Sequence, residues 1–424
     1  MAEGIPGLWP GVIDAELYKG HPLFFYFLQG LWAKVLGFHL WAAKLLCLLF
    51  ALLLLVQTYR VGFRLTGNRW SGLVPAILIG VHGMLLAQST LVLPEVLMAA
   101  LVLWSGYAYW QHRYWQAGVL MLLAVLTKES AIIFAGALGL HYLLNMAWHW
   151  RQLNGWRSAL HLLYLSVPIV GYGLFLVWQH QLYGWWFYPD HVDRMLRGWA
   201  VLQARSQAFF DILFLFNNLR YLTAAFVVAL VVVLVRKQKL NGRFLSMSAL
   251  MIVTFWLFSA FNFFSNRYLL VLLPLVILSL WHIIVVAIPK SSLKAVVGVV
   301  LVGLVAWGTW DKRNWGDANP WHTKLVQLHA SAADYLAEQE AQPDSIATHF
   351  LMTYYLTEPI AGYVTPQDTF SHVFNWPVEG AKWLLVSNIE KEPWLEEWKH
   401  RPDFEQTWRQ EYPEVGWVEI YRKR

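Results

Sequence analysis

Acidic side chains are scarce in the first 310 residues of this 424-residue chain. Eight of the 26 Asp and Glu residues occur there, against 21 of the 32 Lys and Arg residues, so this stretch carries a net charge of +13. The remaining residues hold eighteen acids and eleven bases. The sequence therefore predicts two regions of opposite charge. The eight acids are Glu3, Asp14, Glu16, Glu95, Glu129, Asp190, Asp193 and Asp211.

Cysteine and nucleotide-binding loops are also lacking. Cys47 is the single cysteine of the chain, which excludes an intramolecular disulfide framework and a cysteine-based metal site. No phosphate-binding P-loop motif occurs, so direct ATP-driven transport is not expected. Seven histidines in and near the apolar runs show no metal-ligand spacing, namely His39, His82, His112, His141, His149, His161 and His282. The sequence leaves the need for a divalent metal open. No nucleic-acid partner is expected.

Apolar residues, in contrast, are abundant. They make up 58% of the chain, 16% of the residues are aromatic, and the mean hydropathy is +0.43. These values exclude a water-soluble fold of this length and predict an all-α polytopic membrane protein. About 20 apolar residues are needed to cross the hydrocarbon as a helix, with some shorter exceptions. Ten spans are predicted, at approximately 40–58, 71–87, 89–108, 114–127, 130–146, 159–182, 219–235, 244–262, 268–288 and 291–310.

The placement of Lys and Arg orients these spans, because positive residues in short loops stay on the cytoplasmic side. One set of loops, which includes Arg60, Arg64 and Arg113, contains no acid and is predicted to be cytoplasmic. The opposite set contains nearly all the acids and also leads into the region after Trp310. An acidic cluster on one membrane face is a candidate active site, and this face is predicted to be extracytoplasmic.

Three parts follow from this topology. Residues 1–39 form a first-loop remnant with a juxtamembrane helix at 22–37, and 40–310 form the membrane domain. Residues 311–424 form a small extracytoplasmic α/β domain with a helix at 323–340, strands at 345–351 and 381–389, and a hairpin of 404–412 and 417–422. Because residues 1–39 would begin outside without an export signal, we expect either that the true start lies upstream of Met1 or that an upstream first helix was lost.

Glu95 follows Pro94 at the start of a predicted span. An ionisable group within a span is costly unless it faces a cavity or a partner, which makes Glu95 a functional candidate. The alternative is a carboxylate stabilised by the helix dipole, with Pro94 as a helix starter. Lys128 and Glu129 lie between two short apolar helices at the same face. They form either a local ion pair or a cationic site for a lipid phosphate.

Further candidates are found in three extracytoplasmic segments. Lys19 and His21 precede the juxtamembrane helix, where a turn before Pro22 also explains the pattern. Arg267 and Tyr268 start the ninth predicted span, as a headgroup anchor or as a phosphate ligand. The loop at 183–205 mixes aromatic residues with charges that include Asp190 and Arg194. It is interpreted either as a cap over the site or as an interfacial helix.

In their order, these motifs resemble those of the C-type (GT-C) membrane glycosyltransferases, the superfamily of protein O-mannosyltransferases and lipid A aminoarabinose transferases. The resemblance covers nearly the whole chain, although each motif alone is short. The matching segments are His21 to Tyr26, Pro94-Glu95, Leu126-Thr127-Lys128, Asn266 to Leu270 with Pro274, and an extracytoplasmic C-terminal domain.

The resemblance implies transfer of a sugar from a polyprenyl-phosphate donor to an extracytoplasmic lipid, glycan or protein in the bacterial inner membrane. Such a transfer needs a carboxylate as general base and cations that stabilise the departing phosphate. His21, Glu95 and Lys128 match family positions. The family's catalytic acid follows a first helix that is absent here, so Asp14 and Glu16 are the nearest acids that could replace it.

Two alternatives remain from the sequence. A transporter or flippase for a lipid-linked substrate would have paired broken helices and ionisable groups deep in the membrane, whereas here these groups cluster at one face. A catalytically degenerate relative that acts as a scaffold is the other. A transferase should lose turnover when Glu95 or Lys128 is replaced, and a scaffold should tolerate both changes.

Overall fold

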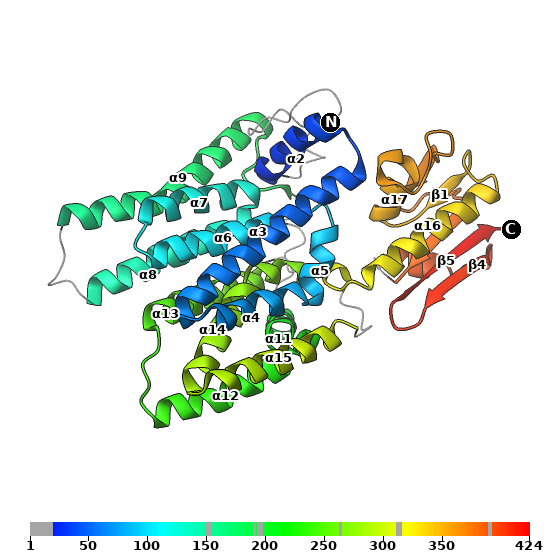
Figure 1. The fold of residues 1–424 in the computed structure, drawn as a ribbon. Coiled ribbons are helices and arrows are strands. Elements are labelled where there is room, and N and C mark those ends of the chain that lie inside the picture. The colour runs from blue at the N-terminus through cyan, green and yellow to red at the C-terminus, as the bar shows by residue number, and fades with distance from the viewer. Residues whose placement is uncertain are drawn as a thin grey trace. The chain divides into compact units, whose positions relative to one another are not determined.

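The computed structural model describes residues 20–148, 155–189, 192, 198–262, 265–310, 316–388 and 392–424. The chain divides into two compact units, residues 1–311 and residues 312–424, each described by itself below. The first unit is helical and the second is built on a β-sheet (Figure 1).

Helices account for the regular structure described in the first unit. The longer ones are α2 (Phe24–Leu36), α3 (Leu40–Thr66), α4 (Arg69–Gly80), α5 (Gly83–Thr90), α6 (Glu95–Trp110), α7 (Tyr114–Thr127), α8 (Ile132–Trp148), α9 (Gly155–Tyr183), α11 (Trp199–Phe210), α12 (Leu219–Val235), α13 (Gly242–Phe261), α14 (Leu273–Ala287) and α15 (Ser291–Gly308). Four short helical segments connect them: η1 (Glu129–Ala131), η3 (Asp211–Leu215), η4 (Phe216–Asn218) and η5 (Asn266–Val271).

Six helical stretches among the described residues are long and apolar enough to cross a membrane. A seventh results if α4 and α5, which are bent by 62° at their break, count as one span. The helical, polytopic fold class is therefore as predicted, but the number of ten spans is not confirmed. The six stretches are Leu40–Thr66, Glu129–Trp148, Gly155–Tyr183, Trp199–Val235, Gly242–Phe261 and Ser291–Gly308.

Two of the helices outside this set, α6 and α14, form the centre of the bundle. Fourteen of the 16 residues of α6 and 13 of the 15 residues of α14 are buried. Short, predominantly apolar helices of this kind are typical of a protein core. In Figure 1, α6 runs between α3 and α7. The predicted span at 89–108 is wrong in its start, because Pro94 lacks the N–H needed to continue a helix and α6 begins at Glu95.

Glycines allow some helices to pack at backbone contact. A Cβ atom added to Gly62 of α3 would lie 2.7 Å from the carbonyl oxygen of Gly72 in α4. In a membrane, where lipid is as apolar as leucine, close van der Waals packing through small residues drives helix association. The pairs α3–α4 and α7–α9 pack in this way, with Gly118 of α7 against the carbonyl oxygen of Tyr164 in α9.

The second unit contains a five-stranded mixed sheet in the order β2-β1-β3-β5-β4. β1, β2 and β3 are parallel, whereas β5 is antiparallel to both β3 and β4. Its elements are η6 (Gly316–Ala318), α16 (His322–Glu338), β1 (Ser345–Ala347), α17 (Phe350–Thr357), η7 (Pro359–Ala361), β2 (His372–Phe374), β3 (Trp383–Ser387), α18 (Pro393–Trp398), β4 (Phe404–Tyr412) and β5 (Gly416–Lys423).

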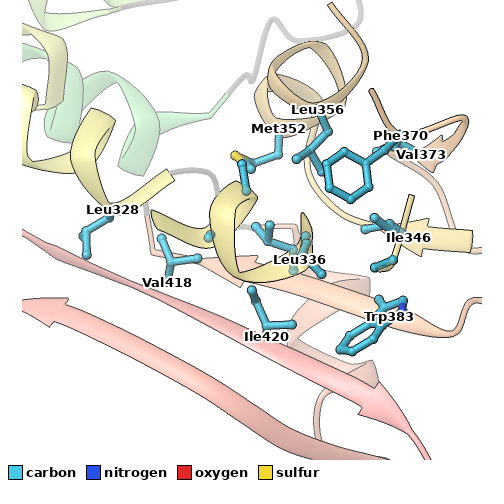
Figure 2. Packing of buried hydrophobic residues seen from close by; sticks show 14 of the residues in the cluster. Leu328, Leu336, Ile346, Met352, Leu356, Phe370, Val373, Trp383, Val418 and Ile420 are labelled. Atoms are coloured by element: carbon cyan, nitrogen blue, oxygen red, sulfur yellow. The ribbon is translucent and has the colours of Figure 1, made fainter. Parts of the chain in front are cut away.

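Strand β3 is buried on both faces because its apolar residues alternate between two cores. Trp383 and Leu385 belong to the larger core, which includes Leu328 and Leu336 of α16. Leu384 and Val386 pack in a smaller core with Leu395 of α18, as the two-residue period of a strand requires. Figure 2 shows Trp383 of β3 and Val418 and Ile420 of β5 beside α16 in the larger core.

The predicted helix at 323–340, the strand at 381–389 and the hairpin are confirmed by α16, β3, β4 and β5. The strand predicted at 345–351 is wrong in its second half. β1 ends at Ala347 and α17 begins at Phe350, because Met352 and Leu356 of this apolar run are spaced for one helical face and are both buried.

Candidate functional site

Four segments bring charged side chains together at one end of the helical unit. His21 precedes α2, Glu95 is the first residue of α6, Lys128 and Glu129 join α7 to α8, and Arg267 lies in η5. These segments are far apart in the sequence, but α6 packs against both α7 and η5. α6 and α7 are antiparallel neighbours, so the start of α6 and the end of α7 lie at the same end of the bundle. This places Glu95 near Lys128 and Glu129.

Glu95 is the centre of this cluster. Its side chain is 1% exposed, and its Oε1 atom accepts hydrogen bonds from Lys128 Nζ at 2.7 Å and from Arg267 Nε at 3.1 Å. Its Oε2 atom is buried and has no hydrogen-bond partner in the described part of the chain. Two cations on a buried carboxylate compensate its desolvation, and the N-terminal dipole of α6 adds to this.

Lys128 is held from two sides. Its ammonium group lies 3.7 Å from the centre of the Tyr268 ring, in addition to its bond to Glu95. The side chain is only 6% exposed, so the ammonium group is fixed within the protein rather than extended into solvent. Such a desolvated cation interacts more strongly with an anion than a solvated lysine would.

Glu129 pairs with His21 rather than with its neighbour Lys128. The distance from His21 Nδ1 to Glu129 Oε2 is 2.9 Å, and both side chains are about one-third exposed, at 28% and 31%. The interpretation of Lys128 and Glu129 as a local ion pair is therefore wrong. The extended backbone of Lys128 between α7 and η1 sends the two consecutive side chains to different partners.

A cavity of about 410 Å³ adjoins this cluster. His21, Lys128, Glu129 and Tyr268 line it, whereas the buried Glu95 does not. Glu95 therefore positions Lys128 at the cavity wall. The other lining residues are Gly20, Ser130, Ile132, Tyr172, Gln179, Phe187, Tyr188, Val192, Phe258 and Asn262.

Six of the residues singled out in the sequence thus lie together: His21, Glu95, Lys128, Glu129, Arg267 and Tyr268. The other five, Asp14, Glu16, Lys19, Asp190 and Arg194, lie outside the described residues. Of the loop at 183–205, Phe187, Tyr188 and Val192 line the cavity, and α11 begins within it at Trp199.

Sequence reasoning missed Tyr172 and Gln179 of α9 and Asn262 at the end of α13. Gln179 is 1% exposed, and its Nε2 atom donates to the carbonyl oxygen of Trp186 at 2.8 Å. The sequence signal that could have found Gln179 is a polar side chain inside an apolar helix, because such a group needs a partner within the protein. Within the described residues, no group of three His, Cys, Asp or Glu side chains could hold a metal ion.

Comparison with known proteins adds the fold family. No family model matches this sequence, and no curated protein sequence matches it. The structure is similar to the crystal structure of ArnT from Cupriavidus metallidurans bound to undecaprenyl phosphate, with a TM-score of 0.50 and 15% identity over 95% of this chain and 88% of that one. ArnT from the same organism in the apo state gives a TM-score of 0.48 and 14% identity over the same shares.

The likeness to undecaprenyl-phosphate-bound ArnT extends over nearly the whole chain. It confirms the resemblance found in the sequence at the level of the fold. The chain thus has the fold of the ArnT-like GT-C membrane glycosyltransferases.

Proposed function

We propose that this protein is an integral membrane glycosyltransferase that transfers a sugar from a polyprenyl-phosphate carrier to an extracytoplasmic acceptor. The observation that carries the proposal is the fixed ammonium group of Lys128 at the wall of the 410 Å³ cavity. The ArnT structure with the same fold is bound to undecaprenyl phosphate, a carrier of this class.

In the proposed reaction, an acceptor hydroxyl attacks the anomeric carbon of the sugar while the bond between that carbon and the phosphate oxygen breaks. Lys128 stabilises the negative charge that develops on the departing phosphate, and Arg267 contributes from the other side of Glu95. A preorganised, partly desolvated cation suits this role because it needs little rearrangement during the reaction.

The hydroxyl proton must pass to a base as the new bond forms. Glu129 takes this role in the scheme. It pairs with His21 and is the carboxylate that lines the cavity among the described residues. Asp14 and Glu16 remain candidates for the same role. Glu95 is a positioning residue in this scheme, because both cations already bind its Oε1 atom and it does not line the cavity.

We assign the protein to the bacterial inner membrane, with the site and residues 311–424 on the extracytoplasmic side. This orientation is supported by the Lys and Arg residues of the opposite loops.

The test is a transfer assay with purified protein in liposomes, a set of polyprenyl-phosphate-linked labelled sugars and a bacterial envelope lipid extract as acceptor. Mass spectrometry would measure the release of free polyprenyl phosphate. Lys128→Met should lower turnover by about 100-fold or more, the usual effect of removing one donor to a developing anion. Lys34→Met, at an exposed position of α2, is the matched control and should retain activity.

Retention of full turnover by Lys128→Met would contradict the assigned role of this lysine. Movement of the labelled carrier across the liposome membrane without release of polyprenyl phosphate would instead favour the flippase alternative.

A further inference from the structure

A second cavity lies at the opposite end of the bundle from Glu95, and the proposed transfer reaction does not use it. Its volume is about 650 Å³, and α3, α6 and α7 form its walls. Trp104 and Tyr107 of α6 lie nine and twelve residues beyond Glu95, or about 14 and 18 Å along the helix. The lining residues are Gln57, Tyr59, Arg60, Phe63, Arg64, Trp104, Tyr107, Arg113, Trp115, Gln116, Val119 and Leu120.

Three arginines converge on this cavity without acidic partners. Arg60 and Arg64 come from the last turns of α3, and Arg113 precedes α7. The chain has no Asp or Glu between Glu16 and Glu95, or between Glu95 and Glu129. The one acid of the helices that form the cavity, Glu95, lies at the far end of α6 and does not line it. Within the described residues, none of the three guanidinium groups forms an ion pair.

Gln57 provides a second, independent observation. It lines the cavity beside Arg60, three residues along α3, and is 1% exposed. Its Oε1 atom is buried without a hydrogen-bond partner among the described residues. An unpaired buried amide is unfavourable unless a bound molecule or water satisfies it.

The lining also changes from charged to apolar with depth. Arg113 is at the start of α7, whereas Val119 and Leu120 lie about 10 Å further along it. Gln57 is likewise seven residues deeper in α3 than Arg64, and Trp104 is deeper in α6 than Tyr107. Phe63 and Trp115 at the rim are 40% and 56% exposed. Such a gradient matches an amphiphile with an anionic head and an apolar chain.

We propose that the cavity lined by α3, α6 and α7, called the groove below, binds the phosphate headgroup of an anionic phospholipid. Arg60, Arg64 and Arg113 contact the phosphate, since guanidinium groups bind phosphate oxygens in a fork geometry. One acyl chain lies along Val119 and Leu120. In the topology derived from the sequence the groove opens to the cytoplasmic leaflet, where anionic lipids bind basic pockets between membrane helices.

The test uses the full-length protein in neutral detergent and native mass spectrometry with phosphatidylglycerol, and phosphatidylcholine as the zwitterionic comparison. The triple variant Arg60→Gln/Arg64→Gln/Arg113→Gln should bind phosphatidylglycerol at least about tenfold more weakly, because it loses the charged hydrogen bonds to the phosphate. The control variant Arg157→Gln/Arg236→Gln/Lys239→Gln removes three exposed cations outside the groove and should bind like the wild type.

Gln57→Met keeps the size of the side chain and removes the amide. It should weaken phosphatidylglycerol binding several-fold, and unchanged binding would overturn the assignment of a lipid seated in the groove. Equal losses in the two triple variants would also overturn it, since they would show unspecific charge attraction. Displacement of the lipid by millimolar inorganic phosphate would assign the site to a free phosphate instead. Thermal unfolding of each variant checks that all of them are folded.

Discussion

Glu95 illustrates how a buried charge depends on its partners. Its carboxylate is 1% exposed and holds Lys128 and Arg267 on one oxygen. Replacing it by Gln keeps the shape but leaves two cations without compensation. Removing one partner from a buried ion pair typically costs about 3–5 kcal/mol, more than the pair itself contributes to stability.

We therefore predict that Glu95→Gln destabilises the helical unit by roughly 3–5 kcal/mol. In the double variant Glu95→Gln/Lys128→Met the loss should be clearly smaller than the sum of the two single losses, since the unpaired ammonium is then absent. Thermal unfolding in detergent of the wild type, both single variants and the double variant measures this coupling. Additive losses would show that the two groups do not stabilise each other.

His329 of α16 is a second buried polar residue, at 3% exposure. Its ring packs against those of His349 and Tyr355, both at 5.6 Å, and its Nε2 atom has no hydrogen-bond partner in the described chain. Desolvation, with smaller contributions from His349 and His322, lowers the pKa of His329 from 6.5 to about 3. The folded state therefore keeps this ring neutral well into the acidic range.

The unfolded chain would take up the proton near pH 6.5, so this contribution to stability is complete above that pH. It is lost as the pH falls from 6.5 towards 3, by about 1.4 kcal/mol per unit, or roughly 2–3 kcal/mol at pH 4.5. Denaturant unfolding of the second unit at pH 7.5 and 4.5 tests this. His329→Phe should reduce the difference, whereas His400→Gln, at an exposed position, should leave it unchanged.

Among single residues, the sequence predicted five members of the site because charged residues are conspicuous in an apolar chain: His21, Glu95, Lys128, Glu129 and Arg267. It could not pair them correctly. Which carboxylate meets which cation depends on the turn between α7 and η1 and on the approach of η5 to α6, both tertiary features. Tyr172 and Gln179 were missed because most residues around them on α9 are apolar, so the sequence does not show that both face the cavity.

Among the elements, the close contact between α7 and α9 requires glycine at position 118. A Cβ atom at Gly118 of α7 would collide with the carbonyl oxygen of Tyr164 in α9. Backbone atoms cannot move aside as a flexible side chain can. The two helices would have to separate, and α9 carries Tyr172 and Gln179 of the cavity wall.

Gly118→Ala should therefore destabilise the protein by about 1–3 kcal/mol or more, as overpacking does elsewhere. Gly136→Ala and Gly139→Ala in α8 are the matched controls, because nothing lies within 4 Å of either Cβ position. These changes should be neutral or stabilise by up to about 1 kcal/mol, since alanine favours the helix. Thermal unfolding in one detergent compares the three, and a Gly118→Ala protein as stable as the controls would contradict the close packing.

Apolar runs predicted where most helices lie, because hydropathy records the membrane environment directly. Their ends and number were harder to predict. Helices α6 and α14 are shorter than a full span because other helices, rather than lipid, surround them. The bend between α4 and α5 at Val81-His82 leaves no mark in hydropathy, since both halves are apolar.

For the molecule as a whole, the change in composition after residue 310 predicted a second region, and the chain divides at residue 311. The secondary structure of that region was predictable because its strands and α16 have clear apolar periods. Its sheet order was not, since β5 enters between β3 and β4 through pairings that local sequence does not encode. The assignment of this unit to the extracytoplasmic side stays a prediction.

The second unit has the interior of an independent domain. Sixteen buried residues form its larger core, and a second core fills the opposite face of the sheet. Domains of about 100 residues usually bury enough apolar surface to fold alone.

We predict that residues 312–424, expressed without the helical unit, are monomeric and unfold in one cooperative transition, measured by circular dichroism and tryptophan fluorescence. Trp383→Ala should abolish this transition or lower its midpoint strongly, because a buried Trp contributes about 3–5 kcal/mol, whereas Trp376→Ala, at a 56% exposed position, should not. A non-cooperative transition in the isolated segment would show instead that its core requires the helical unit.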